Sequence, residues 1–230
     1  MNEILSANDV ILVVDDEMFT RFMTHELLQR IGGPRVLSAR DLAEARGHLN
    51  GPEAGAVRLA LLDVQLPDGT GLELLRDIRC GRLAAASDLP VMIVTGQDSL
   101  GVAAAAIALD VDAFVGKPLS ADSLRDHLGY LLGTHRLVEG PEYYSTIDIG
   151  GISAPAVPLP AAQHPADAVG VEWNELTPGV RIVCDILGPA GELLVQRNTV
   201  LTERLIRLLH GLKNAGMALD TIFIEAGHGG

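Results

Sequence analysis

The segment that decides the fold is Val57-Arg58-Leu59-Ala60-Leu61-Leu62-Asp63, which runs directly into the turn sequence Val64-Gln65-Leu66-Pro67-Asp68-Gly69-Thr70-Gly71. A short apolar run bounded by turn residues is typical of a buried strand in a parallel sheet. Apolar residues then recur at helical spacing from Leu72 to Ile78, which predicts a helix just past the turn. The strand therefore ends on a carboxylate, where open α/β sheets bind ligands. A strand-end Asp can equally cap the next helix, so the rest of the chain must decide its role.

The composition predicts a soluble, cytoplasmic protein. The 230 residues are 48% hydrophobic, and the formal net charge of −13 argues against nonspecific binding to nucleic acid or to an anionic membrane. Cys80 and Cys184 lie far apart without metal-ligand spacing, which favours a reducing compartment over a disulfide framework. The first nine residues lack the layout of a signal peptide, and no apolar run is long enough to span a bilayer.

Strands and helices alternate through residues 1–133, which we expect to form the first domain. Strands are predicted at residues 10–14, 35–39, 57–63, 90–94 and 111–115. The helices that follow them are predicted to end near residues 31, 49, 80, 109 and 132, with Ser120 as the N-cap of the last. Five strands alternating with five helices predict an α/β fold with a doubly wound parallel sheet.

Polar residues follow four of these strands at their carboxyl ends: Asp15, Asp16, Asp63, Thr95 and Lys117. Those ends share one edge of a parallel sheet, so the side chains should converge. Three clustered carboxylates repel one another, and a hard divalent cation, for which Mg²⁺ is the first candidate, relieves the repulsion. A hydroxyl and an ammonium group beside them suit the oxygens of a phosphoryl group. The residues predict phosphoryl transfer to or from a carboxylate.

This arrangement resembles the receiver domain of two-component response regulators over about residues 9–133. The matching features are Asp15-Asp16, Asp63, Thr95-Gly96 and Lys117-Pro118 at the ends of the first, third, fourth and fifth strands, together with the loop and helix start at residues 66–75. The resemblance implies a flavodoxin-like receiver fold. The alternative is a flavodoxin-like domain in which the carboxylates occur by chance.

The resemblance implies the roles of the acidic residues. Asp63 would accept a phosphoryl group from a histidine kinase or a phosphotransfer protein. Asp16, Asp63 and the backbone carbonyl of Gln65 would bind Mg²⁺ directly, and Asp15 would hold the metal through water.

The resemblance also implies a switch. Lys117 would pair with the phosphoryl group, and Thr95 would hydrogen-bond it when the switch closes, while Gly96 leaves room for the phosphodonor. Phe114 matches the aromatic switch position, although it could equally be an ordinary core residue. The family further implies a cis peptide between Lys117 and Pro118.

The predicted helix at residues 99–109 carries no charged residue. A surface helix normally has a charged outer stripe. Residues 100–109 could be a docking face that moves on phosphorylation, or the pattern could reflect a chain that uses Ala freely, as at residues 84–86. Both interpretations remain open at this point.

Residues 134–170 are rich in Pro, Ala and Gly and are predicted to be a semi-extended linker, with a loop, or else a short strand or docking segment, at residues 143–149. Residues 171–230 predict a small α+β module. It has strands at residues 180–187, 192–195 and 220–225 and a helix that begins after the N-cap Thr202.

The module has a looser resemblance to the accessory domain found beside HD-GYP cyclic-dinucleotide phosphodiesterases. The matching segments are residues 176–179, Asp185, residues 191–194 and residues 199–202. The phosphodiesterase domain itself is not implied, because the sequence contains no His-Asp pair and no Gly-Tyr-Pro.

The sequence therefore predicts a response regulator that is not an enzyme. Its output would be a protein–protein contact of the C-terminal module with a downstream partner or a second copy. The alternative is a DNA-binding transcriptional regulator with a recognition helix at residues 202–213. Against it, residues 171–230 hold five Lys/Arg and seven Asp/Glu, and no preceding helix completes a helix-turn-helix. A phosphohydrolase with an Asp nucleophile is disfavoured, because residues 15–17 have their carboxylates in a row rather than as Asp-x-Asp.

Overall fold

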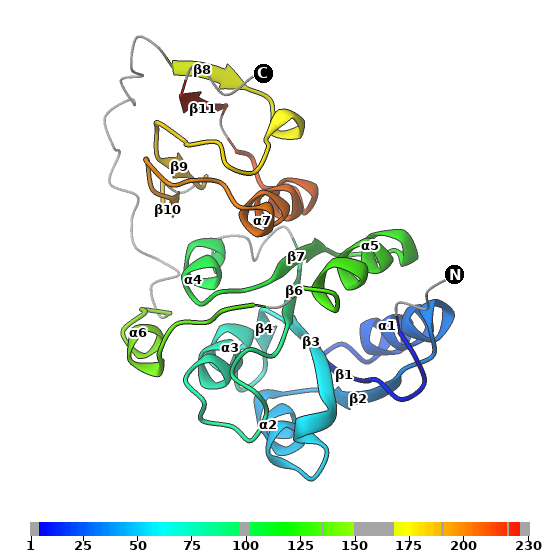
Figure 1. The fold of residues 1–230 in the computed structure, drawn as a ribbon. Coiled ribbons are helices and arrows are strands. Elements are labelled where there is room, and N and C mark those ends of the chain that lie inside the picture. The colour runs from blue at the N-terminus through cyan, green and yellow to red at the C-terminus, as the bar shows by residue number, and fades with distance from the viewer. Residues whose placement is uncertain are drawn as a thin grey trace.

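A five-stranded parallel sheet carries helices on both faces, and a smaller group of elements stacks against one edge of it (Figure 1). The computed structural model describes residues 5–96, 102–134, 136–149, 168–189, 191–219 and 221–225. Within these residues no helix combines the length and the apolar character that crossing a membrane requires.

The strands are β1 (Val10–Val14), β2 (Arg35–Ala39), β3 (Val57–Asp63), β6 (Val91–Thr95) and β7 (Ala113–Gly116). Their order is β2-β1-β3-β6-β7, and every pairing is parallel. The predicted doubly wound, flavodoxin-like sheet is confirmed. Its central strands are buried on both faces, which explains their continuous apolar runs.

Five helices cover the sheet: α1 (Met18–Ile31), α2 (Leu42–Asn50), α3 (Gly71–Arg79), α4 (Ala103–Ala108) and α5 (Ala121–Leu131). Helices α1 and α5 contribute Leu28 and Leu124 to the core on one face, whereas α2, α3 and α4 contribute to the other. Ser120 caps α5 as predicted, because its hydroxyl accepts from the Ser123 amide at 3.1 Å. The predicted start of α4 at residue 99 lies outside the described residues.

The turn after β3 is held by backbone contacts. A minimal hairpin joins β4 (Gln65–Leu66) to β5 (Gly69–Thr70), and the amide of Gly71 donates to the Val64 carbonyl at 2.9 Å. A Cβ at residue 71 would collide with the carbonyl oxygen of Asp63, so glycine is required where α3 begins. This close approach places Asp63 directly beside the helix start.

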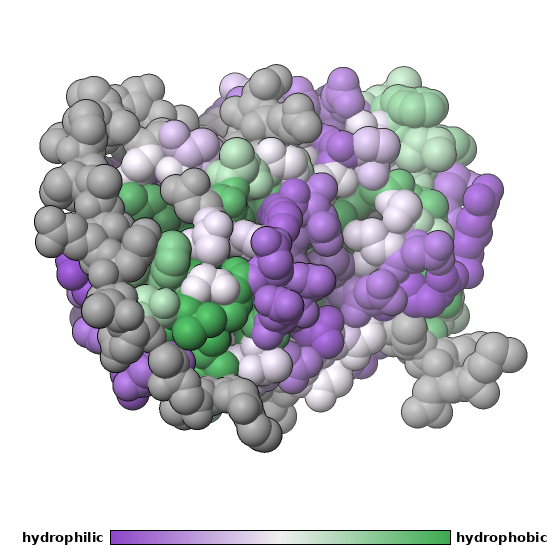
Figure 2. Space-filling model, turned by 90° about the horizontal axis from the view of Figure 1, so that it is seen from above, coloured by the Kyte–Doolittle hydropathy of each residue, from purple (hydrophilic) through white to green (hydrophobic). Residues whose placement is uncertain are grey.

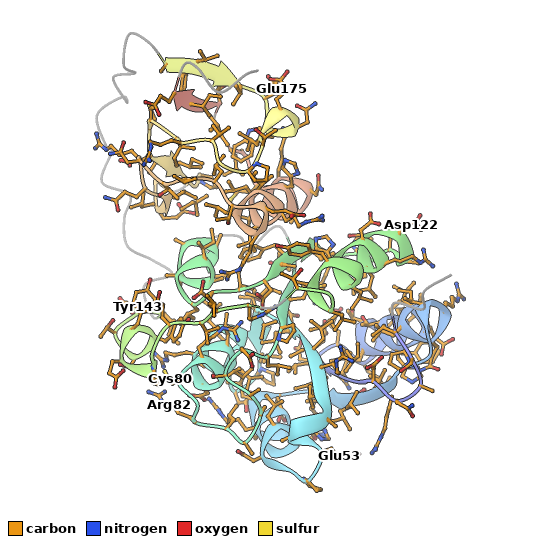
Figure 3. All side chains as sticks on the ribbon, in the orientation of Figure 1. Glu53, Cys80, Arg82, Asp122, Tyr143 and Glu175 are labelled. Carbon is orange, nitrogen blue, oxygen red and sulfur yellow. The ribbon has the colours of Figure 1, made fainter. Side chains whose placement is uncertain are left out.

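Part of the predicted linker is ordered. A short helix, α6 (Pro141–Ser145), replaces the loop or strand expected there. The Tyr144 side chain is fully buried, and its hydroxyl donates to Asp110 Oδ2 at 2.6 Å and accepts from the Glu139 amide at 2.7 Å. Its neighbour Tyr143 points outward (Figure 3). One buried aromatic anchor with a satisfied hydroxyl explains why this segment packs against the sheet domain.

The C-terminal module contains β8 (Ala168–Val171), a 3₁₀ turn (Trp173–Glu175), β9 (Ile186–Leu187), β10 (Leu193–Val195), α7 (Glu203–Asn214) and β11 (Ile222–Glu225). Strand β8 was not expected; it pairs antiparallel with β11. The long strand predicted at residues 180–187 is shorter, since Arg181 and Ile182 form only isolated bridges. Thr202 caps α7 as predicted, accepting from the Leu205 amide at 3.2 Å.

The module lies on the sheet domain along β7, between α4 and α5 (Figure 1). Helix α7 packs along β7, and β10 contacts α4. Ala104 and Ala105 of the uncharged helix are partly buried against this shared apolar core. For the described part of that helix, contact with the module accounts for the absence of a charged stripe.

Candidate functional site

Three carboxylates meet at the carboxyl edge of the sheet. Asp15 and Asp16 follow β1, and Asp63 ends β3, the neighbouring strand. One oxygen from each lies within 4.8 Å of the others. Asp15 and Asp63 are buried, whereas Asp16 is exposed. The parallel strand order brings these side chains together.

Lys117 lies between two of the carboxylates. Its Nζ is 2.6 Å from Asp63 Oδ2 and 2.8 Å from Asp15 Oδ2. Burial disfavours the charged ammonium, but the hydrogen bonds and negative charges of Asp15 and Asp63 outweigh it and raise the pKa of Lys117 above its usual value. Lys117 is therefore a fixed positive charge at the edge of the sheet.

Burial also dominates at Asp15, where it raises the pKa of the carboxyl above its ordinary value. The charge of Asp63 acts in the same direction, whereas Lys117 and the Glu17 amide, which donates to Asp15 Oδ1 at 2.9 Å, act against it. Ionisation of Asp15 therefore carries a cost in the folded protein. A further cation nearby would lower that cost.

Thr95 and Gln65 border the same site. Thr95 ends β6, is buried, and donates its hydroxyl to the Gly96 carbonyl at 3.0 Å rather than to Asp63. The backbone N–H of Gln65 donates to Asp63 Oδ1 at 3.4 Å. A Cβ at Gly96 would meet no atom within 4 Å, so the space above the strand end is open.

An open pocket of about 520 Å³ lies at this edge of the sheet. Its walls are Asp16, Glu17, Asp63, Gln65, Leu66, Pro67, Gly96 and Lys117. A reacting group from another molecule could reach Asp63 through it without a rearrangement of the backbone.

The donor set fits a hard divalent cation. Three carboxylates and one ammonium group leave two negative charges uncompensated, and carboxylate oxygens are the ligands that Mg²⁺ prefers. The exposed Asp16 faces the pocket, so the cation could keep several of its waters.

Phe114 lies on β7, three residues before Lys117, and its side chain is 1% exposed. It belongs to the apolar core on the side of the sheet that the module shares. The peptide between Lys117 and Pro118 is cis, as the resemblance implied. The burial of Phe114 agrees with an inward switch residue and with an ordinary core residue alike.

Sequence reasoning missed two contacts that tie neighbouring helices to the loops around the site. Arg21 of α1 donates to the Asp15 carbonyl at 2.6 Å and so ties the helix to the end of β1. Asp68, in the turn after β3, accepts from the amides of Leu42 and Ala43 at 2.8 and 3.0 Å and caps α2. These backbone hydrogen bonds lower the pKa of Asp68. The Asp68 contact could not be foreseen, because it joins segments 26 positions apart, whereas Arg21 lies only six residues from Asp15.

Comparisons with known proteins agree with this geometry. The family described as "Response regulator receiver domain" matches residues 11–129. The chemotaxis protein CheY homolog of Campylobacter jejuni is 30% identical over 124 residues, which cover 54% of this chain and 92% of that protein. The cyclic di-GMP phosphodiesterase response regulator RpfG of Xanthomonas campestris is 33% identical over 122 residues, but the match covers 53% of this chain and 31% of RpfG.

A longer match extends beyond the first domain. The KDP operon transcriptional regulatory protein KdpE of Escherichia coli is 26% identical over 189 residues, covering 81% of this chain and 76% of KdpE. Among solved structures, the receiver domain of NtrX from Brucella abortus is 31% identical, with a TM-score of 0.48 over 54% of this chain and 99% of that chain.

Proposed function

Because this chain belongs to the response regulator receiver family, we propose that it is a phosphoacceptor switch in which Asp63 takes a phosphoryl group from a histidine kinase or a phosphotransfer protein. The observation that carries the proposal is the position of Asp63, which lies in the open pocket with Lys117 2.6 Å away. Asp63 thus has a nucleophilic oxygen, a cation for the incoming charge, and access from solvent.

The chemistry needs few groups. A carboxylate oxygen of Asp63 bonds to phosphorus as the P–N bond to the donor's imidazole breaks, and the imidazole leaves with the bonding electrons. Lys117 would then pair with a phosphoryl oxygen, and the Thr95 hydroxyl would turn from Gly96 toward another. Asp15, Asp16, Asp63 and the Gln65 carbonyl would hold Mg²⁺, which supplies positive charge to the phosphoryl oxygens.

The surface for the phosphodonor protein is suggested by α1. Its first two turns expose four large apolar side chains, with Met18 77%, Phe19 71%, Phe22 58% and Met23 41% exposed. This helix begins right after Glu17, which lines the pocket. A donor whose histidine reaches Asp63 must cover this rim, and an exposed apolar patch of this kind marks a protein-binding surface.

Labelling with acetyl phosphate tests the function directly. The full chain should incorporate phosphate only in the presence of Mg²⁺. Mass spectrometry of peptides in which the acyl phosphate has been chemically reduced should place the label on Asp63. Label on another residue, or equal labelling in excess EDTA, contradicts the proposal.

For the output, we infer a protein–protein contact of the C-terminal module rather than DNA binding. Arg204 and Arg207, which a recognition helix would need, are engaged within the chain: Arg204 pairs with Asp110, and Arg207 pairs with Glu203 and lies over the Tyr130 ring. Seen from the module's side, the molecule shows hydrophobic areas divided by a hydrophilic band (Figure 2). A pull-down with and without beryllofluoride, beside a gel-shift assay, separates the two outputs.

We also propose that the chain has no phosphodiesterase activity of its own. The match to RpfG covers only 31% of that protein, and this sequence has no His-Asp pair with which to bind catalytic metals. Turnover of a cyclic dinucleotide that survives loss of Asp16 would overturn this.

A further inference from the structure

Strand β7 takes part in two contacts at once. Its carboxyl end leads into Lys117, whose amide donates to the Thr95 carbonyl at 2.8 Å and whose Nζ reaches Asp63 and Asp15. Strand β7 is the last strand of the sheet, and within the described residues no further strand covers its outer edge. Helix α7 of the module packs there instead (Figure 1).

The packing of α7 on β7 is a contact between backbones. A Cβ at Gly211 would lie 2.5 Å from the carbonyl oxygen of Phe114, and a Cβ at Gly116 would lie 2.9 Å from Cα of Ala215. Either distance is too short for a real contact, so a side chain at either position would push the helix and the strand apart. Glycine on each partner permits the close approach.

Two arginines near the start of α7 hold the helix beside the beginning of β7, away from Lys117. Arg204 donates to Asp110 Oδ1 and to the Val111 carbonyl, both at 2.8 Å, and these residues precede β7 in the chain. The Arg207 guanidinium lies 4.3 Å from the centre of the Tyr130 ring on α5, which follows β7 in the chain. In sequence, the residues that contact α7 therefore lie before, within and after the strand that leads into Lys117.

Resting on the function proposed above, we propose that α7 is a positioning element for phosphoryl binding, with Gly211 and Arg204 as its positioning residues. Docked on β7, the module holds the strand, and with it the Lys117 ammonium, at Asp63. A group placed in advance does not have to be ordered when the phosphoryl oxygens arrive, so docking strengthens the phosphoryl state. By linkage, occupancy of Asp63 strengthens docking by the same factor.

The test measures beryllofluoride binding to the full chain in saturating Mg²⁺ by fluorine NMR, together with the radius of gyration from small-angle X-ray scattering. Gly211→Ala and Arg204→Ala should each weaken beryllofluoride binding by about fivefold or more, the lower range of coupling between sites, and should enlarge the particle. The Gly211→Ala substitution does not weaken α7 itself, because alanine is a better helix former than glycine. Magnesium affinity measured without beryllofluoride should not fall, since Asp15 and Asp63 are held by Lys117 and the proposed effect of α7 is on this cation rather than on the metal ligands.

Matched controls are available on the same chain. Gly47→Ala adds a methyl on α2 that meets no atom within 4 Å, and Arg197→Ala removes an exposed arginine that pairs with Asp185 inside the module. Both should leave beryllofluoride affinity and particle size unchanged. In a Lys117→Ala background, Gly211→Ala should add no further loss, because its effect passes through Lys117.

Each outcome of these measurements either supports or overturns the inference. Undocked variants with unchanged or tighter beryllofluoride binding overturn the inference, as does a loss that persists in the Lys117→Ala background. Unaltered scattering in both variants shows that these residues do not hold the module and overturns it as well. If the wild type binds no beryllofluoride at all, the proposed function fails, and the inference fails with it.

Discussion

Lys117 donates a 2.6 Å hydrogen bond to Asp63 Oδ2, although the two residues are 54 positions apart in the chain. The same Nζ is 2.8 Å from Asp15, so one ammonium group serves two buried carboxylates. The third carboxylate, Asp16, faces the pocket. The shared ammonium group offers positive charge to an incoming phosphoryl group. The three carboxylates still carry two uncompensated negative charges, which a divalent metal ion would balance.

Asp63→Asn should abolish labelling by acetyl phosphate, because an amide oxygen is a far poorer nucleophile than a carboxylate. Asp68→Asn is the matched control: Asp68 lies five residues on, in the same turn, and caps α2 instead of lining the pocket. Radiolabel on gels and intact mass report the result. Persistent labelling of Asp63→Asn would assign the phosphoacceptor elsewhere.

Asp15→Asn should stabilise the fold when no divalent cation is added. Burial raises the pKa of Asp15, so the ionised carboxyl is disfavoured in the folded state. The penalty is full above the raised folded pKa, shrinks as the pH falls through it, and vanishes well below the ordinary value of 3.8. We expect Tm at pH 7 to rise by about 2–4 °C.

Thermal scans from pH 7 downward, with and without MgCl₂, check this prediction. The variant's advantage should narrow toward low pH, and Mg²⁺ should stabilise it less than the wild type, because the variant has lost one carboxylate of the proposed metal site. A variant that melts lower than the wild type at pH 7 without metal would contradict the prediction.

Phe19→Ser and Phe22→Ser should slow phosphoryl transfer from a histidine kinase while leaving labelling by acetyl phosphate intact. Both rings are exposed on α1 beside the pocket, so only a macromolecular donor would contact them. Transfer assays against a panel of purified, autophosphorylated kinases measure the effect. We expect a loss of about tenfold or more for the preferred kinase, as for a buried aromatic anchor in an interface. Equal loss with acetyl phosphate would show damage to the site itself.

Arg79→Ala should destabilise the fold by about 3–5 kcal/mol in urea unfolding, as expected when one partner of a buried ion pair is removed. The Arg79 side chain is fully buried; it donates to the carbonyls of Ser87 and Leu89 at 2.8 Å and to Asp112 at 3.0 Å. Arg82→Ala is the control, because Arg82 lies at the surface near the end of α3 (Figure 3) and pairs there with Asp77. Its loss should cost about 0–1 kcal/mol. Comparable costs for the two variants would contradict the assignment of Arg79 as a structural anchor.

Much of the sheet domain could be predicted because its pattern is local. The apolar run at residues 57–63 by itself predicts a buried strand, and the turn residues that follow predict where the strand ends. Once the strands are known to be parallel, the convergence of Asp15, Asp63 and Lys117 follows from topology, since the carboxyl ends of such strands share one edge.

Helix α6 and strand β8 could not be foreseen in the same way. Both elements are short and border a segment rich in Pro, Ala and Gly. What orders them lies elsewhere: Tyr144 is buried with its hydroxyl hydrogen-bonded to Asp110, and β8 pairs with β11, more than fifty residues further on. No window of sequence contains both partners.

By itself, the sequence determined the strands, the helices that link them and the acidic residues at their ends, because periodicity and turn chemistry act over a few neighbouring residues. Only the tertiary structure decided where the C-terminal module lies. Arg204 and Asp110 are 94 positions apart, and Gly211 meets the backbone of Phe114 because the edge of β7 is open to it. A contact of this kind depends on shape and charge at two distant surfaces, which no local pattern records.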